Sequence, residues 1–312
     1  MRNRRCRWVA ALLLAALLSA CGDGDPARDG VQDDPRALCL SSDCGARRLI
    51  ADLPQLENIA FTSSGRLFVS GQQNLYEIQR TGADTYRAFS LFEAGSGCGG
   101  LTEQRGHLYA LCSGGLYAVR LDDPVARPVF VSALSGMTLP NGMAAGEGNR
   151  LYIADGPIAV QPKIIRLQLD ATDPLRVLAQ DTWLSTLPEF PNGVAIRNGV
   201  LYTTLYVPPL GTVAAIEIQA DGSAGPIRRL ALRGIYDDIA MYGDTLLVAD
   251  FQNGALLQYE LDGTLIQQTG ILRFAQPSSV HVAGPPLFDQ PTALATQRYL
   301  GRGLWAWERF AD

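Results

Sequence analysis

Two stretches of the sequence are near copies of each other: PNGMAAGEGNRLYIAD at residues 140–155 and PNGVAIRNGVLYTTLY at residues 191–206. Each opens with Pro-Asn-Gly, runs into a short apolar segment, turns at residues rich in Gly and Asn, and returns as a second apolar segment. Gly and Asn tolerate the positive φ angles that tight hairpin turns require. Both stretches therefore predict a β-hairpin whose first strand begins near the Asn.

Four looser copies extend this pattern along the chain, each with a first strand that starts at small or polar residues. The six first strands begin, at intervals of 41 to 51 residues, at Glu57, Gly99, Asn141, Asn192, Asp237 and Ser278. Such an interval accommodates four strands of about six residues with their turns, which is one propeller blade. Convincing amphipathic helices are absent. The sequence therefore predicts an all-β, six-bladed β-propeller with four-stranded blades over residues 47–312.

The sixth unit lacks an outer strand of its own, because it stops after GLWAWERF at residues 303–310. The segment 47–53 is apolar enough to form a strand and has no other assignment. We expect this N-terminal strand to complete the sixth blade and close the ring, since closure removes an exposed sheet edge.

The N-terminus has the pattern of an export signal. Four arginines precede an apolar run at residues 8–18, which is too short to span a bilayer and has the length of a signal-peptide core. The run ends in LSAC at residues 18–21, which resembles the lipobox of bacterial lipoprotein precursors. The resemblance implies a signal peptide at 1–20 and lipidation of Cys21; the alternative is an ordinary signal peptide followed by a chance cysteine. Residues 21–46 mix Asp with Gly, Pro and Arg and predict a disordered tether.

The predicted compartment is the bacterial envelope. Gly22 lies where an aspartate would resemble an inner-membrane retention signal, so we expect a lipid anchor in the outer membrane and a domain that faces the periplasm. The net charge of −5 argues against nucleic acid or an anionic membrane surface as partner. We expect a monomer that contacts the membrane only through its lipid.

Replacing the lipidated cysteine tests this assignment. Cys21→Ser should release the protein from membranes or block its maturation, because serine offers no thiol for lipid attachment. Incorporation of labelled fatty acid, measured in the wild type and the variant, checks this result, and equal labelling of both would refute the anchor.

Four cysteines remain after Cys6 and Cys21 are set aside, and an even number in an oxidising compartment suggests disulfides. Residues 101–103 and 107–109 read as the arms of a hairpin, which sets Cys98 opposite Cys112. Directly opposed antiparallel residues are close enough for a disulfide. We therefore pair Cys98 with Cys112, and Cys39 with Cys44 by default. A zinc site is the alternative, although no histidines lie nearby.

The first residues of the six inner strands should form a ring at one mouth of the central channel. Two carboxylates and two carboxamides converge there, from Glu57, Asn141, Asn192 and Asp237. Hard oxygen donors of this kind suit Ca²⁺, which takes six to eight oxygen ligands and accepts water for the remainder. Without a cation, Glu57 and Asp237 would face each other partly desolvated, which is unfavourable. The ring therefore predicts a calcium site.

This ring resembles that of the senescence-marker-protein, gluconolactonase and luciferin-regenerating-enzyme family, and more distantly that of the paraoxonases. The resemblance covers residues 47–312 and is specific only at the four ring positions. It implies that Glu57, Asn192 and Asp237 are metal ligands, that Asn141 is an additional asparagine of the site, and that calcium activates ester or lactone hydrolysis.

The chain departs from the paraoxonases in lacking histidines at the channel mouth. Its only histidines, His107 and His281, lie elsewhere in the pattern, and packing explains His281 better than catalysis. A general base would have to be a carboxylate, for which Asp237 and Asp238 are the nearest candidates. Gly99 also leaves one position of the ring without a side chain.

Aromatic residues flank the predicted mouth and suggest a hydrophobic ester or lactone as substrate. The candidates for substrate binding are Trp183, Phe190, Tyr206, Tyr236 and Phe251. The alternative is that they only pack the longer loops. Asp155 and Asp250 end second strands, where loop capping explains them better than chemistry.

Three functions remain open. The first is a calcium-dependent hydrolase of esters or lactones, in which a carboxylate activates water. The second is a non-enzymatic binding or scaffolding lipoprotein with a structural calcium. The third is a strictosidine-synthase-like propeller with altered chemistry. The sequence contains no Walker A motif and no Gly-x-Ser-x-Gly elbow.

Overall fold

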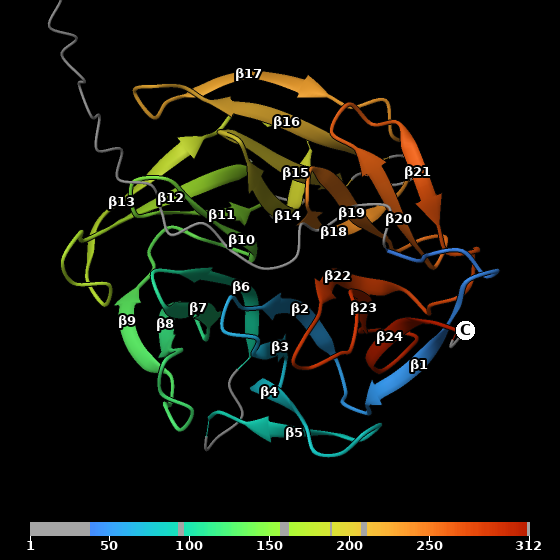
Figure 1. Ribbon diagram of the computed structural model, residues 1–312. Coiled ribbons are helices and arrows are strands. Elements are labelled where there is room, and N and C mark those ends of the chain that lie inside the picture. Colours follow the sequence, from blue (N-terminus) through green and yellow to red (C-terminus); the bar gives the residue numbers. More distant parts are fainter. Residues whose placement is uncertain (1–37, 93–96, 157–161, 188, 207–210, 311–312) are drawn as a thin grey trace, which may run out of the picture. The chain divides into compact units, whose positions relative to one another are not determined.

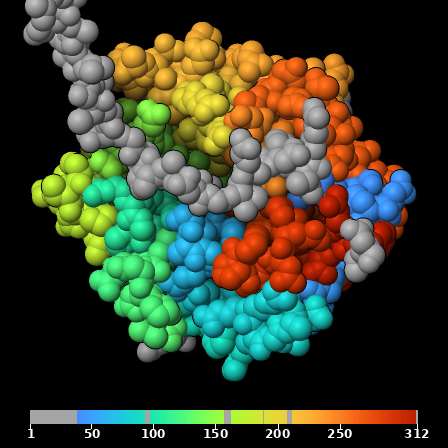
Figure 2. Space-filling view, viewed as in Figure 1, coloured from blue at the N-terminus to red at the C-terminus, as the bar shows by residue number. Residues whose placement is uncertain are grey.

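The computed structural model describes residues 38–92, 97–156, 162–187, 189–206 and 211–310. These residues form six antiparallel sheets of four strands each, arranged in a ring as a β-propeller (Figure 1). The space-filling view shows the blades as successive coloured sectors (Figure 2). The predicted fold class is therefore confirmed. The predicted signal peptide and Cys21 lie outside the described residues.

The first three blades follow one another along the chain. Blade 1 consists of β2 (Leu56–Phe61), β3 (Leu67–Gly71), β4 (Leu75–Arg80) and β5 (Tyr86–Ser90). Blade 2 consists of β6 (Cys98–Gln104), β7 (His107–Cys112), β8 (Gly115–Arg120) and β9 (Val129–Ala133). Blade 3 consists of β10 (Pro140–Gly146), β11 (Arg150–Asp155), β12 (Lys163–Leu169) and β13 (Val177–Leu184).

The remaining blades complete the circle. Blade 4 consists of β14 (Phe190–Arg197), β15 (Val200–Tyr206), β16 (Thr212–Ile218) and β17 (Ala224–Arg229). Blade 5 consists of β18 (Tyr236–Tyr242), β19 (Thr245–Asp250), β20 (Ala255–Glu260) and β21 (Leu265–Gln268). Blade 6 consists of β22 (Pro277–Ala283), β23 (Thr292–Gln297), β24 (Gly303–Arg309) and β1 (Gly45–Ala51).

The N-terminal strand closes the ring as predicted. β1 pairs antiparallel with β24, so that both ends of the propeller chain share one sheet (Figure 1). A separate apolar cluster fills the space between each pair of neighbouring blades. The core is therefore distributed around the ring, and the channel axis is left to the polar ends of the inner strands.

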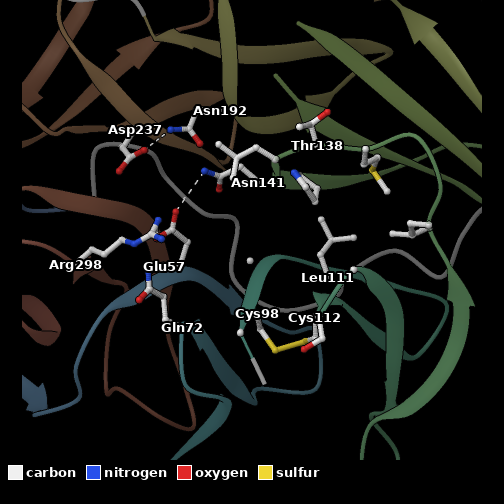
Figure 3. A pocket seen from close by; sticks show the side chains of 18 of the residues that line it. Glu57, Gln72, Cys98, Leu111, Cys112, Thr138, Asn141, Asn192, Asp237 and Arg298 are labelled. Atoms are coloured by element: carbon white, nitrogen blue, oxygen red, sulfur yellow. Dashed lines mark hydrogen bonds and ion pairs between the residues drawn. A yellow bond between two sulfur atoms is a disulfide. The ribbon is translucent and has the colours of Figure 1, made fainter. Parts of the chain in front are cut away.

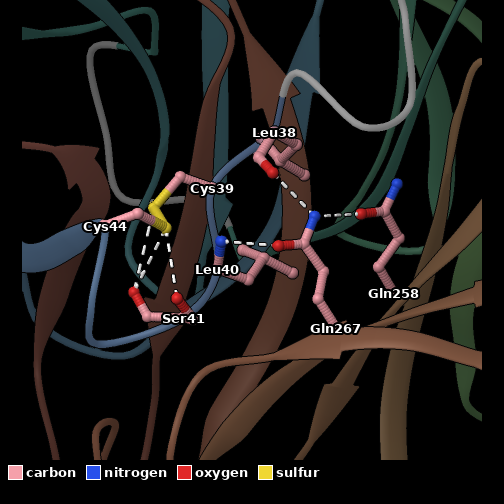
Figure 4. The surroundings of a disulfide bond; sticks show 7 residues. All are labelled: Leu38, Cys39, Leu40, Ser41, Cys44, Gln258 and Gln267. Carbon is pink, nitrogen blue, oxygen red and sulfur yellow. Dashed lines mark hydrogen bonds between the residues drawn. A yellow bond between two sulfur atoms is a disulfide. The ribbon is translucent and has the colours of Figure 1, made fainter.

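The chain packs on the propeller from Leu38 onward, within the segment 21–46 that the sequence predicted to be a disordered tether. Leu38 and Leu40 are buried in the cluster between blades 5 and 6. Gln267 of β21 accepts a hydrogen bond from the Leu40 amide at 3.0 Å and donates one to the Leu38 carbonyl at 2.6 Å (Figure 4). The predicted boundary at residue 46 missed this segment because its two leucines lie among polar residues without strand periodicity.

Both predicted disulfides are present. Cys98 and Cys112 face each other across β6 and β7, with Cα atoms 4.1 Å apart. Cys39 and Cys44 close a short loop just before β1 (Figure 4). Among the described residues, no helix is long and apolar enough to cross a membrane.

Candidate functional site

The site is a pocket of about 630 Å³ at the mouth where the inner strands begin (Figure 3). Its floor is polar and includes Glu57, Asn141, Asn192 and Asp237, the four side chains that the sequence assigned to the ring. Its walls are largely apolar. The structure thus brings the four predicted metal ligands together beneath one opening.

A break in strand pairing aims these side chains at the channel. In all six blades the register between the inner two strands shifts at the first-strand residues that the sequence singled out, 57–58, 99–100, 141–142, 192–193, 237–238 and 278. Such bulges release residues from the ladder and redirect their side chains. The repeated pair of small or polar residues in the sequence is therefore the signature of the bulge.

Hydroxyl groups of the second strands hold these bulges in place. Thr204 Oγ1 accepts from the Gly193 amide at 2.8 Å and donates to the Asp237 carbonyl at 3.0 Å. Thr296 Oγ1 donates to the Glu57 carbonyl at 2.6 Å. The backbone groups that the bulges leave unpaired thus find partners in neighbouring strands.

The glycine after each ring asparagine lets adjacent inner strands approach closely. A Cβ at Gly142 would meet the Asn192 carbonyl oxygen and lie 2.8 Å from Gly193 Cα. A Cβ at Gly193 would meet Asp238 and lie 2.6 Å from the Ile239 amide. In each Asn-Gly pair, the asparagine is a predicted metal ligand, and the glycine allows the neighbouring inner strand to pack closely.

Gly142→Ala should destabilise the protein by about 1–3 kcal/mol. The added methyl group would clash with backbone atoms of Asn192 and Gly193 and push blades 3 and 4 apart. Denaturant unfolding measures the loss. Gly284→Ala is the matched control, since no atom lies within 4 Å of a Cβ built there. Equal stability of Gly142→Ala and Gly284→Ala would contradict the close approach.

The ring side chains are hydrogen-bonded to one another. Asn192 Nδ2 donates to Asp237 Oδ1, and Asn141 Nδ2 donates to Glu57 Oε1 at 3.3 Å. Asn58 Nδ2 in turn donates to Asn141 Oδ1 at 3.4 Å. Ser278, the sixth ring residue, donates to the Leu56 carbonyl instead and does not line the pocket.

Arg298 is the functional residue that the sequence analysis missed. It follows β23, and its Nη1 lies 2.5 Å from Glu57 Oε2. Its position nevertheless recurs in every blade. The residue just before each ring position pairs with a residue of the second strand, and the residue after that partner belongs to another ring: Gln72, Ser113, Gly156, Tyr206, Phe251 and Arg298. All of these except Gly156 line the pocket. The same repeat that located the first ring could have found this one.

Burial disfavours ionisation of the carboxyl groups in the ring. Glu57 and Asp237 are only 6% and 8% exposed. Burial raises the pKa of Glu57, against the opposing effects of Arg298 and Asn141. Burial, followed by the charges of Glu57 and Asp238, raises the pKa of Asp237 well above its usual value. The ionised forms of both carboxyls are therefore unfavourable in the metal-free ring, and a bound cation would stabilise them.

These properties fit a bound calcium ion. Glu57 and Asp237 supply carboxylate oxygens, and Asn141 and Asn192 supply amide oxygens, which is a hard donor set. The orientation of an Asn amide follows from its partners, so either end of it can face a cation. No group of three or more His, Cys, Asp or Glu side chains suited to a metal occurs among the described residues. A metal here therefore depends on the two asparagines.

Asp238, the second candidate base, does not line the pocket. It accepts a hydrogen bond from Ser279 Oγ of the neighbouring inner strand. Burial, partly offset by that bond, raises the pKa of Asp238 to about 7. Asp237 and Asp238 are consecutive residues of one bulge, but only Asp237 lines the pocket. Asp237 is therefore the candidate base that faces the pocket.

Three of the five predicted substrate-binding aromatics line the pocket. Phe190, Tyr206 and Phe251 form a chain of edge-to-face contacts that continues to Tyr299, with centroid distances of 6.1, 6.5 and 5.9 Å. Leu111 lies beside the Cys98–Cys112 disulfide (Figure 3), and Met137 and Leu139 are among the other lining residues. The pocket therefore has an aromatic wall and an aliphatic wall over a polar floor.

Trp183 and Tyr236 are corrections to the predicted set. Trp183 is buried between blades 3 and 4, where Nε1 donates to the Gly222 carbonyl at 2.8 Å. Tyr236 is buried between blades 4 and 5, with its hydroxyl 3.4 Å from that of Tyr259. Trp183 belongs to the outer strand β13 and Tyr236 begins the inner strand β18, and both side chains are buried in the core between blades rather than at the mouth.

The remaining candidates have structural partners. Asp155 accepts from the Thr138 and Leu139 amides at 2.9 and 2.7 Å and so shapes one pocket wall. Asp250 accepts from the Asn253 amide at 2.9 Å, as expected of a loop cap. Neither His107 nor His281 lines the pocket.

Comparison with known proteins supports the fold. No family model matches the chain, and no curated protein matches it in sequence. A gluconolactonase from Xanthomonas campestris aligns over 85% of this chain and 90% of its own, with 16% identity and a TM-score of 0.64. The calcium-binding protein regucalcin from Agrobacterium tumefaciens aligns over 87% and 94%, with 14% identity and a TM-score of 0.62. A luciferin-regenerating enzyme aligns over 86% and 98%, with 15% identity and a TM-score of 0.61.

The likeness to these solved structures confirms the fold that the sequence resemblance implied. At such low identity it carries no substrate or catalytic residue over to this chain. The chemistry of the pocket must therefore be argued from its own side chains.

Proposed function

We propose that this protein is a calcium-dependent hydrolase of esters or lactones with an apolar body. The observation that carries the proposal is the pair of buried carboxylates, Glu57 and Asp237, set with two carboxamides at the base of an apolar-walled pocket. Solved propellers of the same fold include a gluconolactonase and a calcium-binding protein. Calcium bound there would polarise a substrate carbonyl and lower the pKa of bound water.

The side chains of the pocket have separate roles in this proposal. Glu57, Asn141, Asn192 and Asp237 hold the metal. Asp237 also accepts the proton taken from water, on its carboxylate oxygen, because it is the candidate base that faces the pocket. Phe190, Tyr206 and Phe251 bind the apolar part of the substrate and exclude water from it.

A small panel of aryl esters and lactones tests the proposal. The purified protein should hydrolyse at least one class with added calcium and lose that activity in chelator. No hydrolysis with saturating calcium, by a protein that binds the ion, would refute the hydrolase.

The second candidate is a non-enzymatic binding lipoprotein whose calcium is structural. Neither of the two histidines lines the pocket, which favours this reading over a paraoxonase-like mechanism. It predicts that calcium raises the melting temperature without any turnover.

The setting of the site is also part of the proposal. The lipobox at residues 18–21 supports a lipid anchor in the bacterial envelope, with the pocket exposed to the periplasm. The net charge of −5 supports a small-molecule ligand over nucleic acid, and we propose a monomer as the working unit.

A further inference from the structure

We infer that Arg298 is an internal counter-cation of the ring, which competes with calcium for Glu57 and so sets the calcium affinity of the site. The inference rests on the proposed metal site but not on hydrolysis. It assigns a role to Arg298, the one basic residue among the described residues that line the pocket.

The contact between the two side chains is direct. Arg298 Nη1 lies 2.5 Å from Glu57 Oε2, and the two side chains are 22% and 8% exposed (Figure 3). Because little water reaches this pair, its Coulomb energy is screened less than that of a surface pair. Displacing the guanidinium from Glu57 therefore opposes the binding of any other cation to that carboxylate.

The pair is nevertheless poorly satisfied by hydrogen bonds. Arg298 Nε is buried without a hydrogen-bond partner, so it takes no part in the contact with Glu57. An Arg–carboxylate pair that serves structure alone is commonly bidentate, with two parallel N–H···O bonds. Glu57 therefore uses only part of the guanidinium's hydrogen-bonding capacity, which makes the contact easier to exchange for another cation.

The charges of the pocket show how the guanidinium of Arg298 can stand in for a metal cation. Among the described lining residues, the charged ones are Glu57, Asp237 and Arg298, so their net charge with both carboxyls ionised is −1 without metal and becomes +1 with Ca²⁺. The guanidinium charge favours the ionised forms of both carboxyls. In the metal-free protein it relieves their repulsion, whereas in the loaded protein it repels the ion that replaces it.

Tyr299 offers the displaced guanidinium a second support. The Arg298 guanidinium carbon lies 5.0 Å from the centroid of the Tyr299 ring, which is 62% exposed at the mouth. A cation over an aromatic face keeps a favourable contact without Glu57. The side chain can therefore leave the carboxylate and remain at the pocket.

Calcium titration by calorimetry tests the inference on purified, metal-stripped protein. Arg298→Gln and Arg298→Met should each bind calcium at least about tenfold more tightly than the wild type, because one nearby positive charge is gone. Arg298→Lys keeps the charge and should stay within about threefold of the wild type. Structural damage would weaken binding, so the expected sign separates the two explanations.

The matched control is Arg302→Gln, which removes the same charge from an exposed residue of the same loop that pairs with Asp52. It should leave the calcium affinity within about twofold of the wild type. In chelator, both neutral Arg298 variants should melt below the wild type, and saturating calcium should close that gap.

The outcomes distinguish this inference from the proposed function. Unchanged or weaker calcium binding by both neutral variants would overturn the role of Arg298 alone. If Arg302→Gln bound calcium as much more tightly as the neutral Arg298 variants, the change would reflect the net charge of the protein in general, and the role of Arg298 would be overturned as well. Absence of calcium binding in every protein, the wild type included, would remove the metal site and the proposed function with it.

Discussion

Asp237→Asn is expected to lower the rate of hydrolysis by about 10²–10⁴, even at saturating calcium. The substitution removes a carboxylate from the ring and, in the proposed function, the group that accepts the proton from water. Its hydrogen bond with Asn192 can still form with an amide, so the fold should survive. Initial rates at rising calcium concentrations, together with melting temperatures, measure the two effects separately.

Two controls isolate the role of this carboxylate. Asn141→Asp adds a charge to the ring and should cost much less activity. Asp244 lies on the same blade as Asp237 and forms an exposed ion pair with Arg197 of blade 4, and Asp244→Asn should leave the rate unchanged. Full activity in Asp237→Asn, at a calcium concentration that restores the wild-type melting temperature, would leave the metal purely structural.

The second large effect concerns pH. The metal-free protein is expected to lose stability as the pH rises from about 5 to 8. The folded-state pKa of Asp237 is raised well above its usual value, and that of Asp238 is raised to about 7, mainly by burial. A raised pKa means that the folded state binds more protons than the unfolded state between the two values, so stability falls as pH rises through that window. For Asp238 alone the loss is on the order of 3 kcal/mol, or several degrees of melting temperature.

Calcium should reverse this trend, because its carboxylate ligands must be ionised. The rise in melting temperature on adding calcium is therefore expected to be larger at pH 8 than at pH 5. Asp238→Asn should flatten the fall in chelator. Asp221→Asn should leave the fall in stability unchanged. Hydrogen bonds from Ser223 lower the pKa of the exposed Asp221 carboxyl, so that this group titrates below pH 5 in both the folded and the unfolded state. A metal-free melting temperature that stays constant or rises from pH 5 to 8 would contradict this account.

The fold was predictable because one structural unit recurs six times. Pro-Asn-Gly in PNGMAA and PNGVAI marks both a hairpin start and a close approach between blades, as the crowding at Gly142 and Gly193 shows. The opposition of Cys98 and Cys112 was predicted from arms at 101–103 and 107–109 in unbroken register. The structure instead pairs Gln104 with His107 and has a bulge at 99–100, and these two differences cancel at the cysteines. The burial of Leu38 and Leu40 was not predicted, because it depends on the apolar cluster between blades 5 and 6, which the local sequence around the two leucines does not indicate.

The site was predictable only where the repeat pointed to it. The four ring residues converge because the same bulge recurs in each blade. Arg298 comes from a position one residue beyond the second strand, where the six side chains differ in type, so only an alignment of the blades on the first ring would have located it. Trp183 and Tyr236 were misplaced because position along the chain does not say whether an aromatic beside an inner strand faces the mouth or the core.

The most direct test of the central claim is a calorimetric titration of calcium into the metal-stripped protein and into Asp237→Asn at pH 8. A calcium site formed by Glu57, Asn141, Asn192 and Asp237 predicts one ion bound per wild-type chain and a large loss of affinity in the variant. No binding by the wild type, or equal binding by both proteins, would show that these four side chains do not form a calcium site.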